Sequence, residues 1–262
     1  MTAITVRPVR ARGHYRLRDV AQMEWVKLRS VRSTWWCLGL LAAAMTGLAV
    51  LSAGNANLGV YSVWPAFMGL QAAPLTVGVL GVLALTSEYS TGMIRATFAA
   101  APHRVVLLAA KTAVTGMVTL AAGQALAFLS FFLMEARMAA PVSYLTLGNP
   151  AVLRAVLMEG AVPCLIALFA LGLGAVFRHT AAAVGVLAGV AYVVPLALTF
   201  LTGGAGNPIL DRTPMIITLQ SLAELTRQPG APAPGAGFGL LCLYAAVALA
   251  AGCFCLLLRG DA

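Results

Sequence analysis

Six long apolar stretches occupy most of this chain, and Glu159 is the only charged residue within them. A helix rises about 1.5 Å per residue, so about 20 residues cross the ~30 Å hydrocarbon core of a bilayer. Each of the six stretches is long enough to do so, and we therefore expect an all-α membrane protein with six transmembrane helices. The predicted spans are 34–53, 63–86, 112–134, 155–177, 181–202 and 237–258.

Composition excludes an ordinary soluble protein. The chain is 61% apolar and 10% charged, whereas about a quarter of the residues of a soluble domain are charged. The segments between the predicted spans are too short to fold as independent soluble domains. We therefore expect one transmembrane domain over 34–258, and any ATPase or other large catalytic module must be on another chain.

The net charge of +9, from 17 basic and eight acidic residues, reports membrane topology. Six spans place both termini on one side, and 13 of the 17 basic residues fall on that side. They are the eight in segment 1–33 together with Arg95, Arg104, Lys111, Arg178 and Arg259. The positive-inside rule then puts both termini, including the short tail 259–262, in the cytoplasm. Topology explains the charge, so no nucleic-acid partner is expected.

Motifs for catalysis are missing from the sequence. There is no HExxH, no GxSxG and no GxxxxGK[ST], and the five cysteines form no CxxC pair. An intramembrane enzyme would need facing catalytic groups at membrane depth, where Glu159 is the only charged residue. We predict no catalytic residue, no bound metal and no cofactor on this chain.

Segment 16–31, just before the first span, has the pattern of an amphipathic helix lying in the membrane surface. One face is apolar, with Trp25 at its edge, and the other carries basic residues that include Lys27 and Arg29. Glu24 falls in the middle of the apolar face. A carboxylate there either pairs with a cation or draws the helix toward protein; the alternative is that it reaches the membrane surface beside Lys27 or Arg18.

The link between spans two and three also carries helix signals. Glu88 and Tyr89 end span two, Ser90 or Thr91 can cap a new helix, and Pro102 stops it. That short helix exposes a semi-apolar ridge, which indicates a protein partner outside the bilayer; a simple turn resting on the lipid headgroups is the alternative. The ridge residues are Met93, Ile94, Thr97 and Phe98.

Three segments resemble the permease subunit of bacterial ATP-binding cassette (ABC) exporters of the type 2 class. They are MEWVKLRSVRS before span one, SEYSTGMIRATFAAAPHR with Lys111 after span two, and GLGAVFRHTAAAV between spans four and five. The resemblance implies a plasma-membrane permease that works as a homodimer or with a sister permease on two separate ATPase subunits. ATP and Mg would bind to those subunits.

The resemblance also implies roles for individual segments. The cytoplasmic helix 91–99 would be the coupling helix seated in the ATPase, and segment 16–31 would pack beside it. The residues so implied are Glu88, Tyr89, Thr91, Gly92, Met93, Ile94, Arg95, Phe98 and Arg104, with Glu24, Trp25, Lys27 and Arg29 on the interfacial helix. We hypothesise that Glu24 pairs with Arg95, Arg104 or Lys111 and so ties the two helices together.

Family analogy places the export path along spans two and five. The residues there that can kink a helix or offer a hydrogen bond are Gln71, Pro74, Tyr192, Pro195 and Thr199. Small residues at Ala181, Gly185 and Gly189 permit close helix contact; we favour packing within the chain, with a contact in a dimer as the alternative. Glu159 is either a functional intramembrane charge or a side chain that reaches outward to Arg154 or Arg212; we favour the outward orientation.

The expected function is therefore export of an amphiphilic drug, antibiotic or lipid-like molecule, driven by a partner ATPase. A membrane scaffold and a stand-alone secondary transporter are the alternatives, with an intramembrane enzyme behind them. A secondary transporter would normally show paired ionisable groups or broken helices near the midplane, and the sequence gives no sign of either.

Overall fold

The computed structural model describes residues 17–53, 64–94, 97, 104–137, 146–202, 207–218 and 233–258. Within these ranges the regular structure is helical, with no strand, which confirms the predicted all-α class. Six helical segments are long and apolar enough to cross a membrane, and the chain is a multi-pass helical membrane protein. The six segments are Arg32–Ser52, Met68–Ser90, Arg104–Arg137, Pro150–Phe177, Thr180–Thr202 and Pro234–Leu258.

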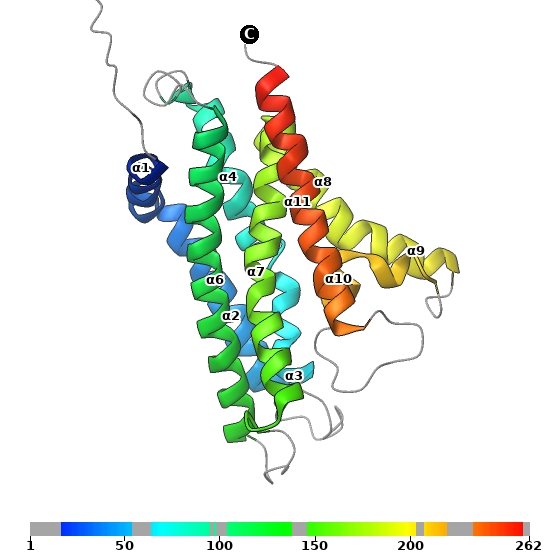
Figure 1. Ribbon diagram of the computed structural model, residues 1–262. Helices are drawn as coiled ribbons and strands as arrows, with labels where there is room; N and C mark the ends of the chain where they lie inside the picture. The colour runs from blue at the N-terminus through cyan, green and yellow to red at the C-terminus, as the bar shows by residue number, and fades with distance from the viewer. Residues whose placement is uncertain are drawn as a thin grey trace, which may run out of the picture.

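Helices that pack around one central helix form the middle of the bundle in Figure 1. They are α4 (Val77–Ser90), α6 (Arg104–Arg137), α7 (Pro150–Phe177) and α11 (Pro234–Leu258). The central helix is α7, which packs against the other three. It begins where the Asn149 side chain accepts a hydrogen bond from the Ala151 amide at 3.0 Å, an N-cap followed directly by Pro150.

Small residues let these helices approach closely. A Cβ added at Gly172 of α7 would collide with the backbone of Ala248 in α11, and one at Gly81 of α4 would collide with the backbone of Ala167 in α7. In a membrane, where lipid tails are as apolar as the side chains, such close van der Waals contact is a main source of helix association. The core therefore depends on small residues as well as on large apolar ones.

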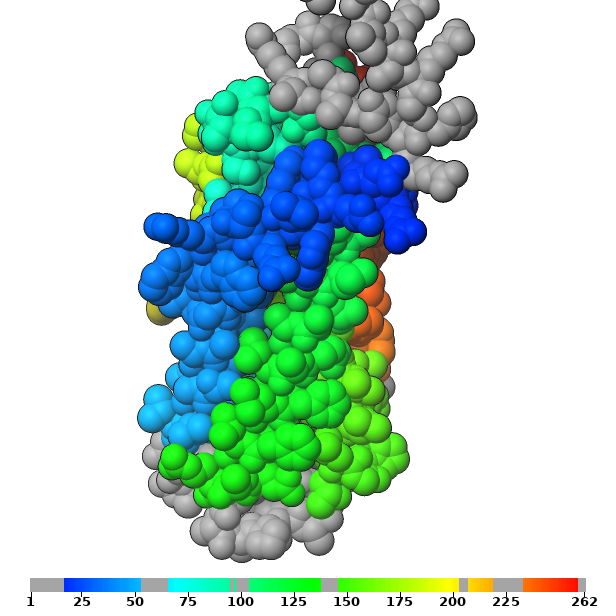
Figure 2. All heavy atoms as spheres, turned by 90° about the vertical axis from the view of Figure 1, so that its left-hand side faces the viewer, coloured from blue at the N-terminus to red at the C-terminus, as the bar shows by residue number. Residues whose placement is uncertain are grey.

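Helix α1 (Leu17–Ser30) lies across the bundle at the end where α4 and α11 terminate (Figures 1 and 2). Its apolar side packs on α6 through Val20, which contacts the cluster of Leu107 and Ala110. Helix α2 (Arg32–Ala53) follows almost at once and runs down the bundle beside α6. The structure thus confirms a separate amphipathic helix before the first span.

Span two is broken, contrary to the expectation from the sequence. It comprises α3 (Trp64–Phe67), the 3-10 helix η1 (Met68–Ala72), a turn, and then α4. Pro74 lies in the turn and cannot donate a backbone hydrogen bond. The Ala72 carbonyl accepts hydrogen bonds from the Thr76 amide at 3.1 Å and from the Thr76 hydroxyl at 3.0 Å, so local bonds close the turn that contains Pro74.

Span five is also irregular. A π-helical turn η2 (Gly189–Val193) separates α8 (Thr180–Ala188) from α9 (Val194–Thr202). Figure 1 shows α9 leaving the bundle, and Phe200 and Leu201 are highly exposed. An added Cβ at Gly185 or Gly189 would meet nothing within 4 Å. The predicted packing of these glycines within the chain is therefore wrong, and a contact with a second copy stays a prediction.

Candidate functional site

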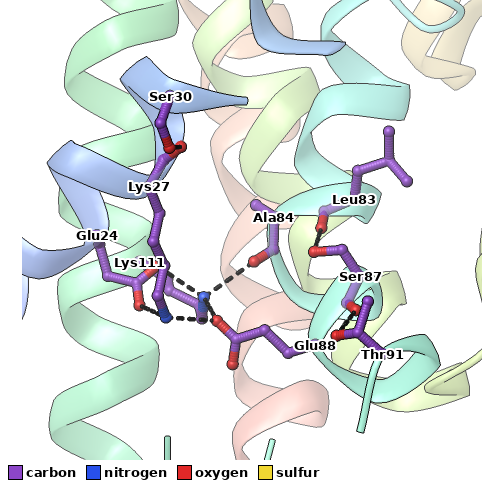
Figure 3. A network of polar contacts seen from close by, with 9 residues as sticks. All are labelled: Glu24, Lys27, Ser30, Leu83, Ala84, Ser87, Glu88, Thr91 and Lys111. Atoms are coloured by element: carbon purple, nitrogen blue, oxygen red, sulfur yellow. Dashed lines mark hydrogen bonds and ion pairs between the residues drawn. The ribbon is translucent and has the colours of Figure 1, made fainter. Parts of the chain in front are cut away.

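Four charged side chains from three helices meet at the α1 end of the bundle. Glu24 and Lys27 come from α1, Glu88 from the last turns of α4 and Lys111 from the first turns of α6. Figure 3 shows the two ammonium groups between the two carboxylates. Residues that are far apart in the sequence thereby join three separate elements in one ion-pair network.

Lys111 is the buried centre of this network. Its side chain is 1% exposed, and its ammonium donates to Glu24 Oε2 at 2.7 Å, Glu88 Oε1 at 2.6 Å and the Ala84 carbonyl at 2.9 Å. These three bonds use all three ammonium protons. A buried cation is stable when it is paired and hydrogen-bonded in this way.

Lys27 completes the network from the more exposed side. Its ammonium lies 3.0 Å from Glu24 Oε1 and 2.9 Å from Glu88 Oε1, and its side chain is 32% exposed. Burial alone would lower the pKa of Lys27, but hydrogen bonds to Glu88 and Glu24 and the attraction of both carboxylates outweigh burial and raise this pKa above its usual value. Lys27 is therefore a stable cation at neutral pH.

Both kinds of partner considered for Glu24, a lysine of its own helix and a cation of another segment, contact it in the structure. The carboxylate pairs with Lys27 of its own helix and with Lys111 of α6. Of the other partners considered, Arg95 lies outside the described residues, and Arg104 donates to the Leu256 carbonyl of α11 at 2.9 Å. Sequence reasoning missed that Glu88 would join the same network, although an acid at the end of one span and a lysine at the start of the next was a usable signal.

The predicted start of the coupling helix is different in the structure. The Ser90 and Thr91 hydroxyls both donate to the Ser87 carbonyl, at 3.0 and 2.7 Å, and so close the end of α4 instead of capping a new helix. Gly92 follows with a φ of 70°, a left-handed conformation suited to glycine.

After this glycine, the Thr97 amide donates to the Met93 carbonyl at 2.9 Å, a hydrogen bond with the i to i+4 spacing of an α-helix. Met93 is 53% exposed and Ile94 is partly exposed, whereas Thr97 is buried. Arg95 and Phe98, and with them most of the predicted segment 91–99, lie outside the described residues. Two residues of the predicted ridge therefore face outward in the part of it that the structure describes.

Other residues implied by the resemblance have partners of their own. The Arg178 guanidinium lies 5.6 Å from the centre of the Tyr89 ring, a cation–π contact that ties the end of α4 to the end of α7. Trp25 and Arg29 are exposed on α1. The Arg29 carbonyl accepts a hydrogen bond from the Trp35 indole at 3.0 Å, across the corner between α1 and α2.

Two of the residues assigned to an export path do meet. The Tyr192 hydroxyl in η2 donates to the Gln71 carbonyl in η1 at 2.5 Å, so the irregular turns of spans two and five face each other. Pro74 lies next to this contact in the chain. Pro195 and Thr199 are in α9, where the Thr199 hydroxyl donates to the Pro195 carbonyl at 2.8 Å.

Glu159 does not reach outward, which corrects the orientation that we favoured from the sequence. Its side chain in α7 is completely buried, and neither carboxylate oxygen has a hydrogen-bond partner in the described part of the chain. Apolar residues of α7 surround its position along the helix, including Val156 and Val162 in two separate core clusters. The helix rotation directs this carboxyl group inward, away from Arg154 and Arg212.

A cavity of about 380 Å³ adjoins the ion-pair network. It is bounded by α1, the start of α2, one face of α4 and the first turns of α6. Nothing in the sequence pattern predicted it, because its existence depends on how far α2 and α4 separate at this end. Elsewhere, no group of three or more His, Cys, Asp or Glu side chains among the described residues could hold a metal ion.

The fold and this site define a multi-pass helical membrane protein with a buried ion-pair network at one end. No protein-family model matches the chain, and no curated protein matches it either.

Proposed function

We propose that this chain is the transmembrane permease subunit of an ATP-driven ABC exporter. The observation that carries the proposal is the network centred on Lys111, which joins α1, α4 and α6 directly before the segment that would bind an ATPase. The resemblance of the quoted segments to type 2 permeases supports the same function. On this proposal the network end of the bundle is cytoplasmic, as the distribution of basic residues predicts.

The network would transmit force between elements. An ATPase that held the segment after Gly92 would pull on the end of α4 as it closed around ATP. Because Glu88 of α4 is paired with Lys111 and Lys27, α6 and α1 would move with α4 as one unit. Binding of ATP would then shift the population from an inward-open to an outward-open arrangement.

The chemistry of ATP hydrolysis would belong to the partner. This chain would contribute the coupling surface and the path, and it would form and break no covalent bond. Two ATPase subunits, with ATP and Mg, and a second permease copy or a sister permease would complete the exporter. The cargo expected from the apolar spans is an amphiphilic small molecule.

The test is isolation of the tagged chain from its native membrane, followed by identification of co-purifying proteins. We expect a soluble chain with a GxxxxGK[ST] motif and vanadate-sensitive ATP hydrolysis. Ile94→Glu should abolish the association, whereas Ala136→Glu, which adds the same single negative charge at an exposed site at the far end of α6, should leave it intact. Absence of any ATPase from the intact complex would contradict the proposal. A purified complex that hydrolyses no ATP would indicate a membrane scaffold.

A second candidate, a stand-alone secondary transporter, is favoured by two observations that the sequence did not predict. Span two is broken between η1 and α4, and Glu159 is a buried carboxyl group without a described partner. Broken helices and ionisable groups inside the membrane are typical of ion-coupled carriers. Transport that persists without ATP and collapses when an ionophore dissipates the proton gradient would select this function over the first.

A further inference from the structure

The cavity beside the network has one apolar side and one polar side. Its apolar side is formed by Leu28 of α1, Val31 before α2, and Leu80 and Leu83 of α4. The residues of α4 that line it recur every three or four positions, so that they form one continuous stripe along the helix. A volume of about 380 Å³ is within the range of small-molecule sites in proteins.

The charged groups of the polar side cancel one another. Two carboxylates, Glu24 and Glu88, face two ammonium groups, Lys27 and Lys111, and each ammonium bonds to both carboxylates. A ligand with a net charge would bring an uncompensated charge against this neutral, largely buried polar side. The cost of desolvating that charge would oppose binding. The polar side of the cavity therefore favours a ligand whose head group has no net charge.

Some polar groups on this polar side nevertheless still have room for a further hydrogen bond. Thr34 and Thr115 line the cavity and are only 4% and 1% exposed, and Glu88 Oε2 is buried with no hydrogen-bond partner among the described residues. Lys27 uses two of its three ammonium protons for the carboxylates. Buried polar groups are normally hydrogen-bonded, so these unused groups indicate that a ligand with oxygen atoms completes them.

We propose that this cavity binds an uncharged amphiphile taken from the bilayer, with a hydroxyl- or carbonyl-bearing head. The head would lie against Thr34, Thr115 and Lys27, and the apolar body against Leu80 and Leu83. Identification of this molecule as the exporter's cargo rests on the proposed function. Binding itself does not, because the described residues of one chain supply both the apolar and the polar side of the cavity.

The experiment uses the full chain alone, without an ATPase, in phosphatidylcholine nanodiscs. Three photoactivatable probes share one dodecyl chain that carries a diazirine and differ only in the head, which is a glycerol ester, a phosphate or a trimethylammonium group. Cross-linked residues are mapped by mass spectrometry. We expect the glycerol ester to label the cavity stripe of α4 and the 111–115 turn of α6 about tenfold more than either charged probe does, a difference of ~1.4 kcal/mol.

Two variants test the site directly. Leu83→Trp fills the cavity and should abolish this labelling, whereas Leu40→Trp, on the exposed side of α2, should not. Thr115→Val keeps the side-chain shape, so the fold is retained, and should weaken labelling about fivefold through loss of one hydrogen bond. Labelling that is insensitive to both cavity variants, or equal for all three heads, would overturn the inference. Neither result would bear on ATPase association, which Ile94→Glu tests separately because Ile94 does not line the cavity.

Discussion

The ammonium of Lys111 donates to Oε2 of Glu24 at 2.7 Å and thereby joins two side chains that are 87 positions apart. Both residues are almost fully buried, so each charge depends on the other for solvation. The same ammonium also holds Glu88. Loss of this single cation would leave two carboxylates at the α1 end of the bundle with only the partly exposed Lys27 between them.

Lys111→Met should therefore destabilise the fold strongly. Removal of one partner from a buried ion pair typically costs about 3–5 kcal/mol, because the remaining charge is left uncompensated. The free energy of unfolding, measured by denaturant titration in detergent, checks this value. The double variant Glu24→Gln with Lys111→Met should recover part of the loss, and simple additivity of the two changes would show that the residues are not coupled.

Glu24→Gln tests whether the network transmits force as well as stability. The amide keeps the shape of the side chain but removes the charge that holds Lys111 and Lys27. With the partner ATPase present, we expect export and permease-stimulated ATP hydrolysis to fall about tenfold or more, while the amount of protein in the membrane stays the same. Unchanged transport and ATP hydrolysis would refute the proposed link between α1 and the coupling segment.

The pKa of Lys27 gives a pH prediction with a definite sign. Because this pKa is raised in the folded protein, the ion pairs of Lys27 contribute fully below the unfolded pKa of about 10.4. That contribution is lost as the pH rises through the folded pKa. The difference in thermal midpoint between the native chain and Lys27→Met should be constant from pH 7 to 9 and shrink above about pH 10; a difference that grows with pH would contradict it.

Glu159→Met should stabilise the protein. The native carboxyl group is completely buried and has no described hydrogen-bond partner, so its desolvation is uncompensated. A methionine of similar length should raise the free energy of unfolding by about 1–3 kcal/mol. A fall in stability would mean that the carboxyl group has a partner in the membrane, and loss of transport in a stabilised variant would assign Glu159 to function.

Gly172→Ala and Gly185→Ala should have opposite effects. The added methyl group at Gly172 would collide with the α11 backbone at Ala248, whereas at Gly185 it would meet nothing within 4 Å. We expect a loss of about 1–3 kcal/mol at Gly172 from overpacking and a gain of about 0.5–1 kcal/mol at Gly185 from helix propensity. A large loss at Gly185 in the intact complex would indicate that a second copy packs there.

Pro74 is a local signal for the break in span two, but its effect on the helix is larger than the sequence pattern indicates. Pro74 lies inside an apolar run that is long enough to be one helix, and proline is tolerated in membrane helices when other groups satisfy the backbone. From the sequence we expected only a kink. The structure instead has a 3-10 helix before Pro74, and the Gln71 carbonyl, three residues before the proline, accepts a hydrogen bond from the Tyr192 hydroxyl of span five.

The sequence by itself determined the six spans, the amphipathic α1 and the presence of Glu24 on its apolar face, because these features follow from length, hydropathy and the 3.6-residue period. From the sequence, Lys111 was only one of three cations that could form an ion pair with Glu24. The tertiary structure alone decided that Lys111 and Lys27 share two carboxylates, that Glu159 faces inward and that a cavity opens beside the network. The physical reason is that pairing and cavities depend on the rotation and separation of whole helices, which no local pattern specifies.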